Sequence, residues 1–180
     1  EGLTVFVPLS VAGDTVRAEI KHIKKRIAFA SIVDIIEPSG NRIAPPCPHF
    51  GICGGCDFQQ MNYEAQLRAK LDIIRDCLKR IGKIEFEDLG IIPSPNEFAY
   101  RSRARWHADR EQQKIGYYAR DSHDTVDVEV CPILSPELEA VLKSLRQNID
   151  WPNMWADTAE IEAAAGARGA VSIYSSDMAE

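Results

Sequence analysis

Three cysteines within ten residues constrain this chain more than any other feature of its sequence. Cys47, Cys53 and Cys56 follow the spacing C-x5-C-x2-C in the segment CPHFGICGGCDF. Thiolates are soft donors, and several of them on one short loop can converge on a metal centre. The glycines of this loop permit backbone conformations that bring the chain close to such a centre. The segment therefore predicts a metal site.

Three thiolates do not complete a cysteine site, so a fourth ligand must come from another segment. Cys131 is the best candidate, because it follows a predicted strand directly before Pro132. Cys77 is a poor one, because it falls in a predicted helix beside an apolar stripe, where a free cysteine acts as a small buried hydrophobe. A triplet with one distant cysteine favours an iron–sulfur centre over zinc, whose structural sites mostly show two close pairs. Zinc and unligated thiols remain the alternatives at this point.

The first 44 residues predict a small β-barrel. Apolar and polar residues alternate over 15–20 and again over 27–36, which is typical of half-buried strands. The basic segment KHIKKR (21–26) predicts the turn between them. Short strands with tight turns indicate a barrel, and we expect its first strand to be missing. Four prolines between Pro38 and Pro48 mark a linker to a second domain, residues 45–180.

The second domain is predicted to mix helices with β-hairpins, so the fold class is α+β. Asn62 predicts the N-cap of a helix over 63–81, and SPE at 135–137 predicts the start of another that ends near 147. Strands are expected over 100–108, 114–120 and 125–130, with a weaker hairpin around 166–169. The apolar stripe of the first helix consists of Leu67, Leu71, Ile74, Leu78 and Ile81.

One face of the predicted strand 100–108 carries a row of cations. Guanidinium groups pair with phosphate in a bidentate fork, and bases could stack on Tyr117 or Tyr118 of the partner strand. The more common alternative is a solvated sheet face whose arginines pair with acids such as Asp127 or Glu129. The row consists of Arg101, Arg103, Arg105 and His107, and the further candidate RNA contacts are Lys24, Lys25, Arg26 and Arg120.

The charge distribution leaves room for a polyanionic partner. The net charge is −6, yet residues 1–110 hold 16 Lys and Arg against 14 Asp and Glu, and residues 111–180 hold 5 against 13. The acidity is therefore confined to the last third of the chain. No glycine-rich phosphate loop and no apolar run long enough for a membrane span occur, and no secretory leader is visible. Clustered cysteines with one left over indicate a reducing, cytoplasmic compartment.

Five segments of the chain resemble the RNA uracil-5-methyltransferases, most of all those that act on 23S rRNA. The most specific is PPCPHFGICGGCDFQQMNYEAQLRAKLDIIRDCLKRIG, residues 45–82. TVFVPLSVAGDTVRAEI (4–20) resembles the TRAM domain of that family, an RNA-binding barrel with an OB-like architecture. YRSRARWH (100–107), GYYARDSH (116–123) and VDVEVCPIL (126–134) resemble its central domain. Gln59–Gln60 departs from the Gln-His that the family often shows.

The resemblance implies a 4Fe–4S cluster on Cys47, Cys53, Cys56 and Cys131, and it raises the RNA-binding interpretation of the arginine row. It implies that this chain is the N-terminal portion of an S-adenosylmethionine-dependent methyltransferase acting on rRNA rather than tRNA. The S-adenosylmethionine-binding catalytic domain lies outside residues 1–180, so we expect the chain alone to be inactive. The alternatives are a zinc- or iron–sulfur-containing RNA-binding module and an electron-transfer protein. We expect a monomer that does not associate with membranes.

Overall fold

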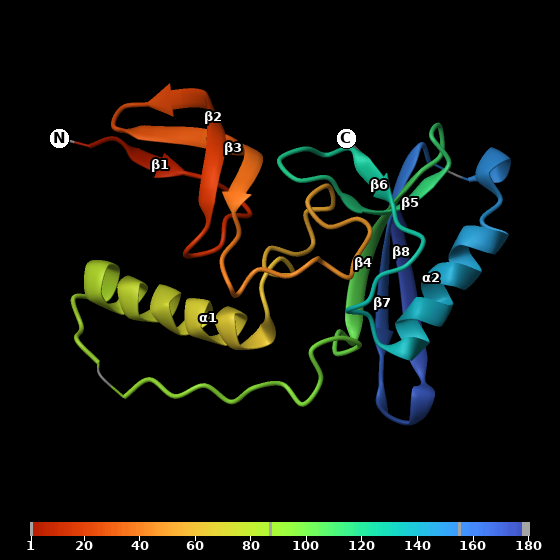
Figure 1. Ribbon diagram of the computed structural model, residues 1–180. Coiled ribbons are helices and arrows are strands. Elements are labelled where there is room, and N and C mark those ends of the chain that lie inside the picture. Colours follow the sequence, from red (N-terminus) through yellow and green to blue (C-terminus); the bar gives the residue numbers. More distant parts are fainter. Residues whose placement is uncertain (1, 87, 155, 178–180) are drawn as a thin grey trace. The chain divides into compact units, whose positions relative to one another are not determined.

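The computed structural model describes residues 2–86, 88–154 and 156–177, which form two compact units of an α+β fold (Figure 1). The first unit comprises Glu1–Pro45 and Asp57–Ile92, and the second comprises Pro46–Cys56 and Pro93–Glu180. The cysteine loop therefore belongs to the second unit. The helix that follows it belongs to the first, whereas the sequence suggested grouping that helix with the later segments.

The first unit is built on a three-stranded sheet of order β1–β3–β2. Strand β1 (Thr4–Phe6) runs parallel to β3 (Ile27–Glu37), and β2 (Thr15–Lys24) runs antiparallel to it. The basic turn is shorter than expected, because β2 extends through Lys24 and the chain reverses at Lys25 with a φ of 57°. Three strands are too few to close on themselves. The described residues thus form an open sheet and not the closed barrel that the sequence predicted.

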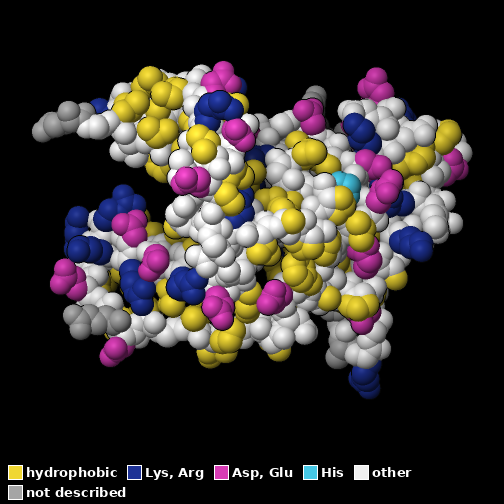
Figure 2. Space-filling view, in the orientation of Figure 1, with side chains coloured by type: hydrophobic (Ala, Val, Ile, Leu, Met, Phe, Trp, Pro, Cys, Tyr) yellow, Lys and Arg dark blue, Asp and Glu magenta, His cyan; other side chains and the backbone are white. Residues whose placement is uncertain are grey.

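One face of this sheet carries apolar side chains that nothing covers within the first unit. Phe29 lies between two other rings, with centroids 5.7 Å from Phe6 and 4.4 Å from His22. Of the alternating apolar residues expected to lie on one side of this half-buried strand, Ile27, Phe29 and Val33 are exposed and Ile35 is half-buried. Figure 2 shows hydrophobic side chains gathered over this part of the molecule. These side chains stay exposed because an open sheet is covered by a second layer on at most one of its faces.

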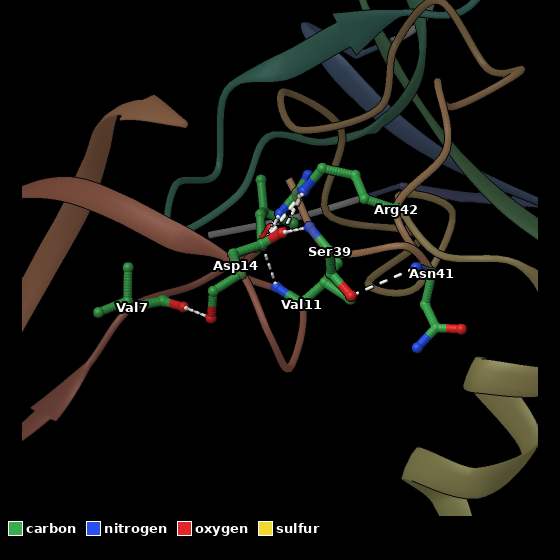
Figure 3. A network of polar contacts seen from close by, with 8 residues as sticks. Val7, Val11, Asp14, Ser39, Asn41 and Arg42 are labelled. Atoms are coloured by element: carbon green, nitrogen blue, oxygen red, sulfur yellow. Dashed lines mark hydrogen bonds and ion pairs between the residues drawn. The ribbon is translucent and has the colours of Figure 1, made fainter. Parts of the chain in front are cut away.

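A buried ion pair holds the loop after β1 to the end of β3 (Figure 3). The Asp14 carboxylate accepts hydrogen bonds from the backbone N–H groups of Val11 and Ser39, at 2.7 and 2.9 Å. Its Oδ2 lies 2.5 Å from Nη2 of Arg42, which also donates to the carbonyl of Leu9. The Asp14 side chain is only 1% exposed. These hydrogen bonds hold the pKa of Asp14 at about 2, against an ordinary value near 3.8.

Helix α1 (Tyr63–Cys77) completes the first unit, and a π-helical turn, Leu78–Gly82, follows it. The Asn62 side chain accepts from the N–H of Ala65 at 2.9 Å, which confirms the predicted cap. Ala65 packs with Val11 and Met61 in a small core. The rest of the predicted apolar stripe is not buried: within α1 only Ala65 is buried, and Ile74 and Ile81 are exposed. The periodicity identified the helix correctly, but among the described residues the members of its apolar stripe are half-buried or exposed.

The second unit is a five-stranded antiparallel sheet of order β6–β5–β4–β7–β8 with one helix packed on it (Figure 1). Both predicted hairpins are present. The strands are β4 (Arg103–Asp109), β5 (Lys114–Tyr118), β6 (Thr125–Asp127), β7 (Thr158–Ala165) and β8 (Val171–Asp177). The helix is α2 (Pro136–Asn148), and single 3-10 turns lie at Trp151–Asn153 and Ala167–Gly169. None of the described helices is long and apolar enough to span a lipid bilayer.

The core of the second unit lies between α2 and the sheet. Trp106 of β4 and Leu138 and Leu142 of α2 are fully buried, and Ile115 and Val128 pack beside them. The burial pattern of β4 alternates, with Ala104, Trp106 and Ala108 inward, as period-two patterning predicts. One apolar layer therefore fixes the strand that carries the arginine row on its opposite face.

Gly116 on β5 allows the closest backbone approach in this sheet, and its replacement by alanine is expected to be costly. A Cβ at this position would lie 2.1 Å from the carbonyl oxygen of Val126 and 2.7 Å from Cγ2 of Val128. Strands β5 and β6 would have to separate, so we expect Gly116→Ala to lower the free energy of unfolding by about 3 kcal/mol. Gly166→Ala is the control, since its nearest neighbour atom would be 3.6 Å away. Urea denaturation curves that coincide for the two variants would contradict this prediction.

Candidate functional site

The cysteine loop is a series of tight turns held against the end of β5. The N–H groups of Phe50 and Cys53 donate to the carbonyls of Cys47 and His49, at 3.1 and 2.9 Å, and Gly51 adopts a φ of 88°. The next turn is joined to the strand, because the N–H of Gly54 donates to the carbonyl of Tyr118 at 2.9 Å. The three cysteines of the loop, Cys47, Cys53 and Cys56, are half-buried.

Gly54 is required by this close approach. A Cβ there would lie 3.2 Å from the carbonyl oxygen of Tyr118, and Cys53 forms a β-bridge with Ala119 on the same segment. The loop backbone therefore packs directly on the connection between β5 and β6. This packing orients the close cysteine pair relative to the sheet.

Cys131 reaches the same region from the segment between β6 and α2. It is 8% exposed, and its N–H donates to a carboxylate oxygen of Glu139 at 3.2 Å. The residues after it pair with residues 99–101: the N–H of Arg101 donates to the carbonyl of Ile133 at 2.8 Å, and the N–H of Ser135 donates to that of Arg101 at 2.9 Å. The strand end and the helix start together fix its backbone.

The four predicted ligand cysteines lie within range of one another's charge. Burial raises the pKa of Cys47 and Cys53, and raises that of Cys131 to about 11. The negative charge of Cys56 raises all three pKa values further, and that of Cys47 raises those of Cys53 and Cys131. All four thiols are free of disulfides. Positive charge placed among these half-buried and buried thiols would favour the ionised forms of Cys47, Cys53 and Cys131.

The described residues do not by themselves show a metal centre at these cysteines. Among the described residues, no group of three or more His, Cys, Asp or Glu side chains stands close enough to hold one metal ion. A single zinc ion would need sulfurs roughly 3.8 Å apart, given Zn–S distances of about 2.3 Å. Cys77 lies on α1 of the first unit, whereas the four predicted ligands lie in the second. It is exposed there and not buried as the helical pattern suggested.

The arginine row divides into members with different surroundings. Arg105 pairs with Glu160 at 3.2 Å and with Glu162 at 2.6 Å, both on β7. Burial raises the pKa of Cys53, and the charge of Arg101 opposes that rise to a smaller extent, so the Arg101 charge acts on this thiol. Arg103 is exposed, and no ion pair of its side chain is found within the described part of the chain. Arg103 is therefore the member best placed to meet a phosphate.

The acids that were expected to neutralise the arginine row lie beside another arginine. Asp127 forms an ion pair with Arg146 of α2, and Glu129 lies 4.0 Å from the same guanidinium. Glu160 and Glu162 of β7 pair with Arg105 instead, and the sequence did not point to them. Alternation in residues 158–165 was the signal that could have put Glu160 and Glu162 on the face of Arg105.

The two tyrosines of β5 also differ in their surroundings. Tyr118 stacks on His107, with ring centroids 3.7 Å apart, and His123 meets its edge at 5.2 Å. Tyr117 lies on the inner face, where burial raises the pKa of its hydroxyl and the charge of Cys131 raises it further. Stacking of a base on Tyr117 is therefore disfavoured.

An open depression of about 540 Å³ lies over β4, β7 and β8. Its lining combines cations and the carboxylate of Glu162 with aromatic, small polar and apolar side chains, including Arg101, Arg103, Arg105, Tyr117, Ser172 and Tyr174. Ser172 and Tyr174 are on β8, which the sequence indicated only as part of a weak hairpin. Lys24, Lys25 and Arg26 are exposed at the β2–β3 turn of the first unit, and Arg120 contacts the cysteine loop.

In its second unit the chain thus combines a cysteine loop with a sheet strand that carries arginines. No protein-family model matches it. It is 36% identical over 152 residues to an RNA methyltransferase of Thermosynechococcus vestitus, covering 82% of this chain and 34% of that protein. It is 37% identical over 153 residues to the 23S rRNA (uracil(1939)-C(5))-methyltransferase of Halomonas elongata, covering 83% of this chain and 32% of that protein.

A solved structure shows the same relationship. The tRNA (uracil-54, C5)-methyltransferase of Pyrococcus abyssi, in complex with S-adenosyl-L-homocysteine, aligns with a TM-score of 0.62 at 26% identity. The alignment covers 94% of this chain and 40% of that protein. The chain belongs to the RNA uracil-5-methyltransferase family, which confirms the resemblance found in the sequence. It spans about a third of the length of the curated relatives that it matches.

Proposed function

We propose that this chain is the RNA-binding and iron–sulfur-binding portion of an S-adenosylmethionine-dependent RNA uracil-5-methyltransferase. What supports the proposal is the relationship of the chain to such enzymes, together with the charges of Cys47 and Cys56, which act on the thiol of Cys131 from another segment. Its substrate would be rRNA, as in the relatives from Halomonas elongata and Pectobacterium atrosepticum. Methyl transfer would require S-adenosylmethionine bound outside residues 1–180, and the chain alone would be inactive.

The four thiolates would hold a 4Fe–4S cluster, which when bound supplies positive charge and a rigid link among four sulfurs. This chain supplies the rest: the turns that present Cys47, Cys53 and Cys56, and the clamped segment that presents Cys131. Such a link would tie the loop to the chain more than 70 residues further on. Its role would be to hold strand β5 and the adjoining arginine strand β4 in one arrangement.

The RNA surface would centre on the depression over β4, β7 and β8. Phosphates would meet Arg103 first, because Glu160 and Glu162 already engage Arg105. In the first unit, Lys24, Lys25 and Arg26 would add contacts to the RNA backbone. The open sheet of that unit would be part of a TRAM-like RNA-binding domain, and the protein would act in the cytoplasm as a monomer.

The identity of the centre is tested by iron and sulfide analysis of protein purified without oxygen. We expect about four iron and four sulfide ions per chain, as a 4Fe–4S cluster on four cysteines requires. Zinc without sulfide would replace the proposal with a zinc-bound RNA-binding module. A cluster that changes RNA binding on mild reduction would favour an electron-transfer role.

RNA binding is tested by a salt titration of Arg103→Gln against an rRNA fragment that contains the target uridine. Loss of one phosphate contact should reduce the slope of log affinity against log salt by about 0.7 to 0.9. Arg17→Gln is the control, because Arg17 is exposed in the first unit and already paired with Asp34 at 2.9 Å. A slope for Arg103→Gln equal to that of the control would remove Arg103 from the RNA surface.

A further inference from the structure

Arg120 lies against the cysteine loop, although the sequence predicted it as an RNA contact. Its Nη2 donates to the carbonyl of Cys56 at 3.1 Å, and its backbone N–H donates to the carbonyl of Ile52 at 2.8 Å. The residue therefore holds the loop on both sides of the close pair, Cys53 and Cys56. Its side chain is partly buried, so its charge is less screened than that of a surface arginine.

The segment that carries Arg120 is the surface on which the loop rests. Ala119 forms a β-bridge with Cys53, and the carbonyl of Tyr118 accepts from Gly54. Arg120 adds to these backbone contacts a charge-assisted hydrogen bond, which is stronger than a neutral one. It also brings a positive charge beside a site built to hold thiolates.

We propose that Arg120 is a positioning residue of the cysteine site and not a ligand for RNA phosphate. Its guanidinium holds the Cys56 carbonyl, so that the turn from Cys53 to Cys56 presents both sulfurs to the same centre. The inference rests on the proposed function for the identity of that centre. The latch, by which we mean the two hydrogen bonds from Arg120 to the loop, does not depend on that identity.

Two effects on the centre follow from this position. Without the latch, the turn is held by backbone contacts alone, and Cys56 is released more readily to a competing ligand. Removal of a positive charge also disfavours the more negative, reduced form of an iron–sulfur cluster, which lowers its reduction potential. If Arg120 only stabilised the fold, its replacement would speed the release of Cys56 through general unfolding. It would not shift the reduction potential of the folded protein.

The test compares Arg120→Gln, Arg120→Lys and Arg103→Gln in the intact protein, purified without oxygen. For Arg120→Gln we expect iron loss to a chelator to be about tenfold faster, as loss of one charge-assisted hydrogen bond implies. We also expect a lower reduction potential and an RNA salt slope equal to the wild type. Arg120→Lys keeps the charge and should restore the potential more fully than the rate of iron loss. Arg103→Gln should change the salt slope and leave the iron properties unchanged.

A second measurement keeps the latch testable if the centre holds no iron. In metal-free, reduced protein, Arg120→Gln should increase the rate at which a thiol reagent modifies Cys53 and Cys56 several-fold, whereas Arg103→Gln should not. Wild-type modification rates for Arg120→Gln would overturn the latch. A salt slope lowered by Arg120→Gln, with unchanged iron loss and potential, would return Arg120 to the RNA surface. Faster modification without bound iron would retain the latch and reject only the proposed cluster.

Discussion

Cys131→Ser is expected to lose most of the bound iron and to weaken RNA binding without touching any group that reacts with uracil. Cys131 is the one cysteine of the four that does not come from the loop, and its backbone is fixed by the Glu139 contact and by α2. Replacement of its sulfur with oxygen removes a soft ligand from an iron–sulfur site. We expect iron below about a tenth of the wild-type content and RNA affinity reduced at least about tenfold, or about 1.4 kcal/mol.

Cys77→Ser is the matched control, because Cys77 is exposed on α1 and is not one of the four predicted ligands. It should retain wild-type iron content and RNA affinity. Wild-type affinity for RNA in an iron-free Cys131→Ser protein would show that the centre does not organise the RNA surface. Full iron content in Cys131→Ser would remove Cys131 from the ligand set.

Asp14→Asn is expected to destabilise the first unit by about 3 kcal/mol, because it leaves the charge of Arg42 without its buried partner. The carboxylate accepts from Val11, Ser39 and Arg42, and an amide can accept from only some of these donors. Urea denaturation followed by a signal from the first unit measures the loss. Asp34→Asn is the control, since the Arg17–Asp34 pair is exposed and should contribute less than about 1 kcal/mol.

The same ion pair should make stability depend on acid. The pKa of Asp14 is about 2 in the folded protein, mainly because Arg42 donates to it, against about 3.8 when unpaired. A lowered folded pKa contributes stability that is fully present above about pH 4 and is lost as the pH falls toward 2. The contribution is roughly 2 kcal/mol, so the difference between wild type and Asp14→Asn should shrink over that window. A difference that stays constant from pH 5 to pH 2 would contradict this assignment.

Local patterns in the sequence predicted the elements of this fold well. Asn62 and Ser135–Pro136 marked both helix starts, and alternation in 100–108 identified β4 and its buried face. These signals are readable because capping and strand alternation depend on residues close together in the chain. The cysteine spacing was of the same kind, since thiolate chemistry and loop glycines belong to one short segment.

Burial and pairing between distant segments were decided only by the tertiary structure. The sequence could not show that Ile74 and Phe29 stay exposed, because burial requires another layer that periodicity does not supply. It could not show that Glu160 and Glu162 occupy Arg105, since their register on β4 is set by strand pairing across more than fifty residues. The sequence also predicted Arg120 as an RNA contact, whereas in the structure its side chain donates to the carbonyl of Cys56. The sequence shows only that residue 120 is an arginine, and the tertiary structure decides which acceptor its side chain contacts.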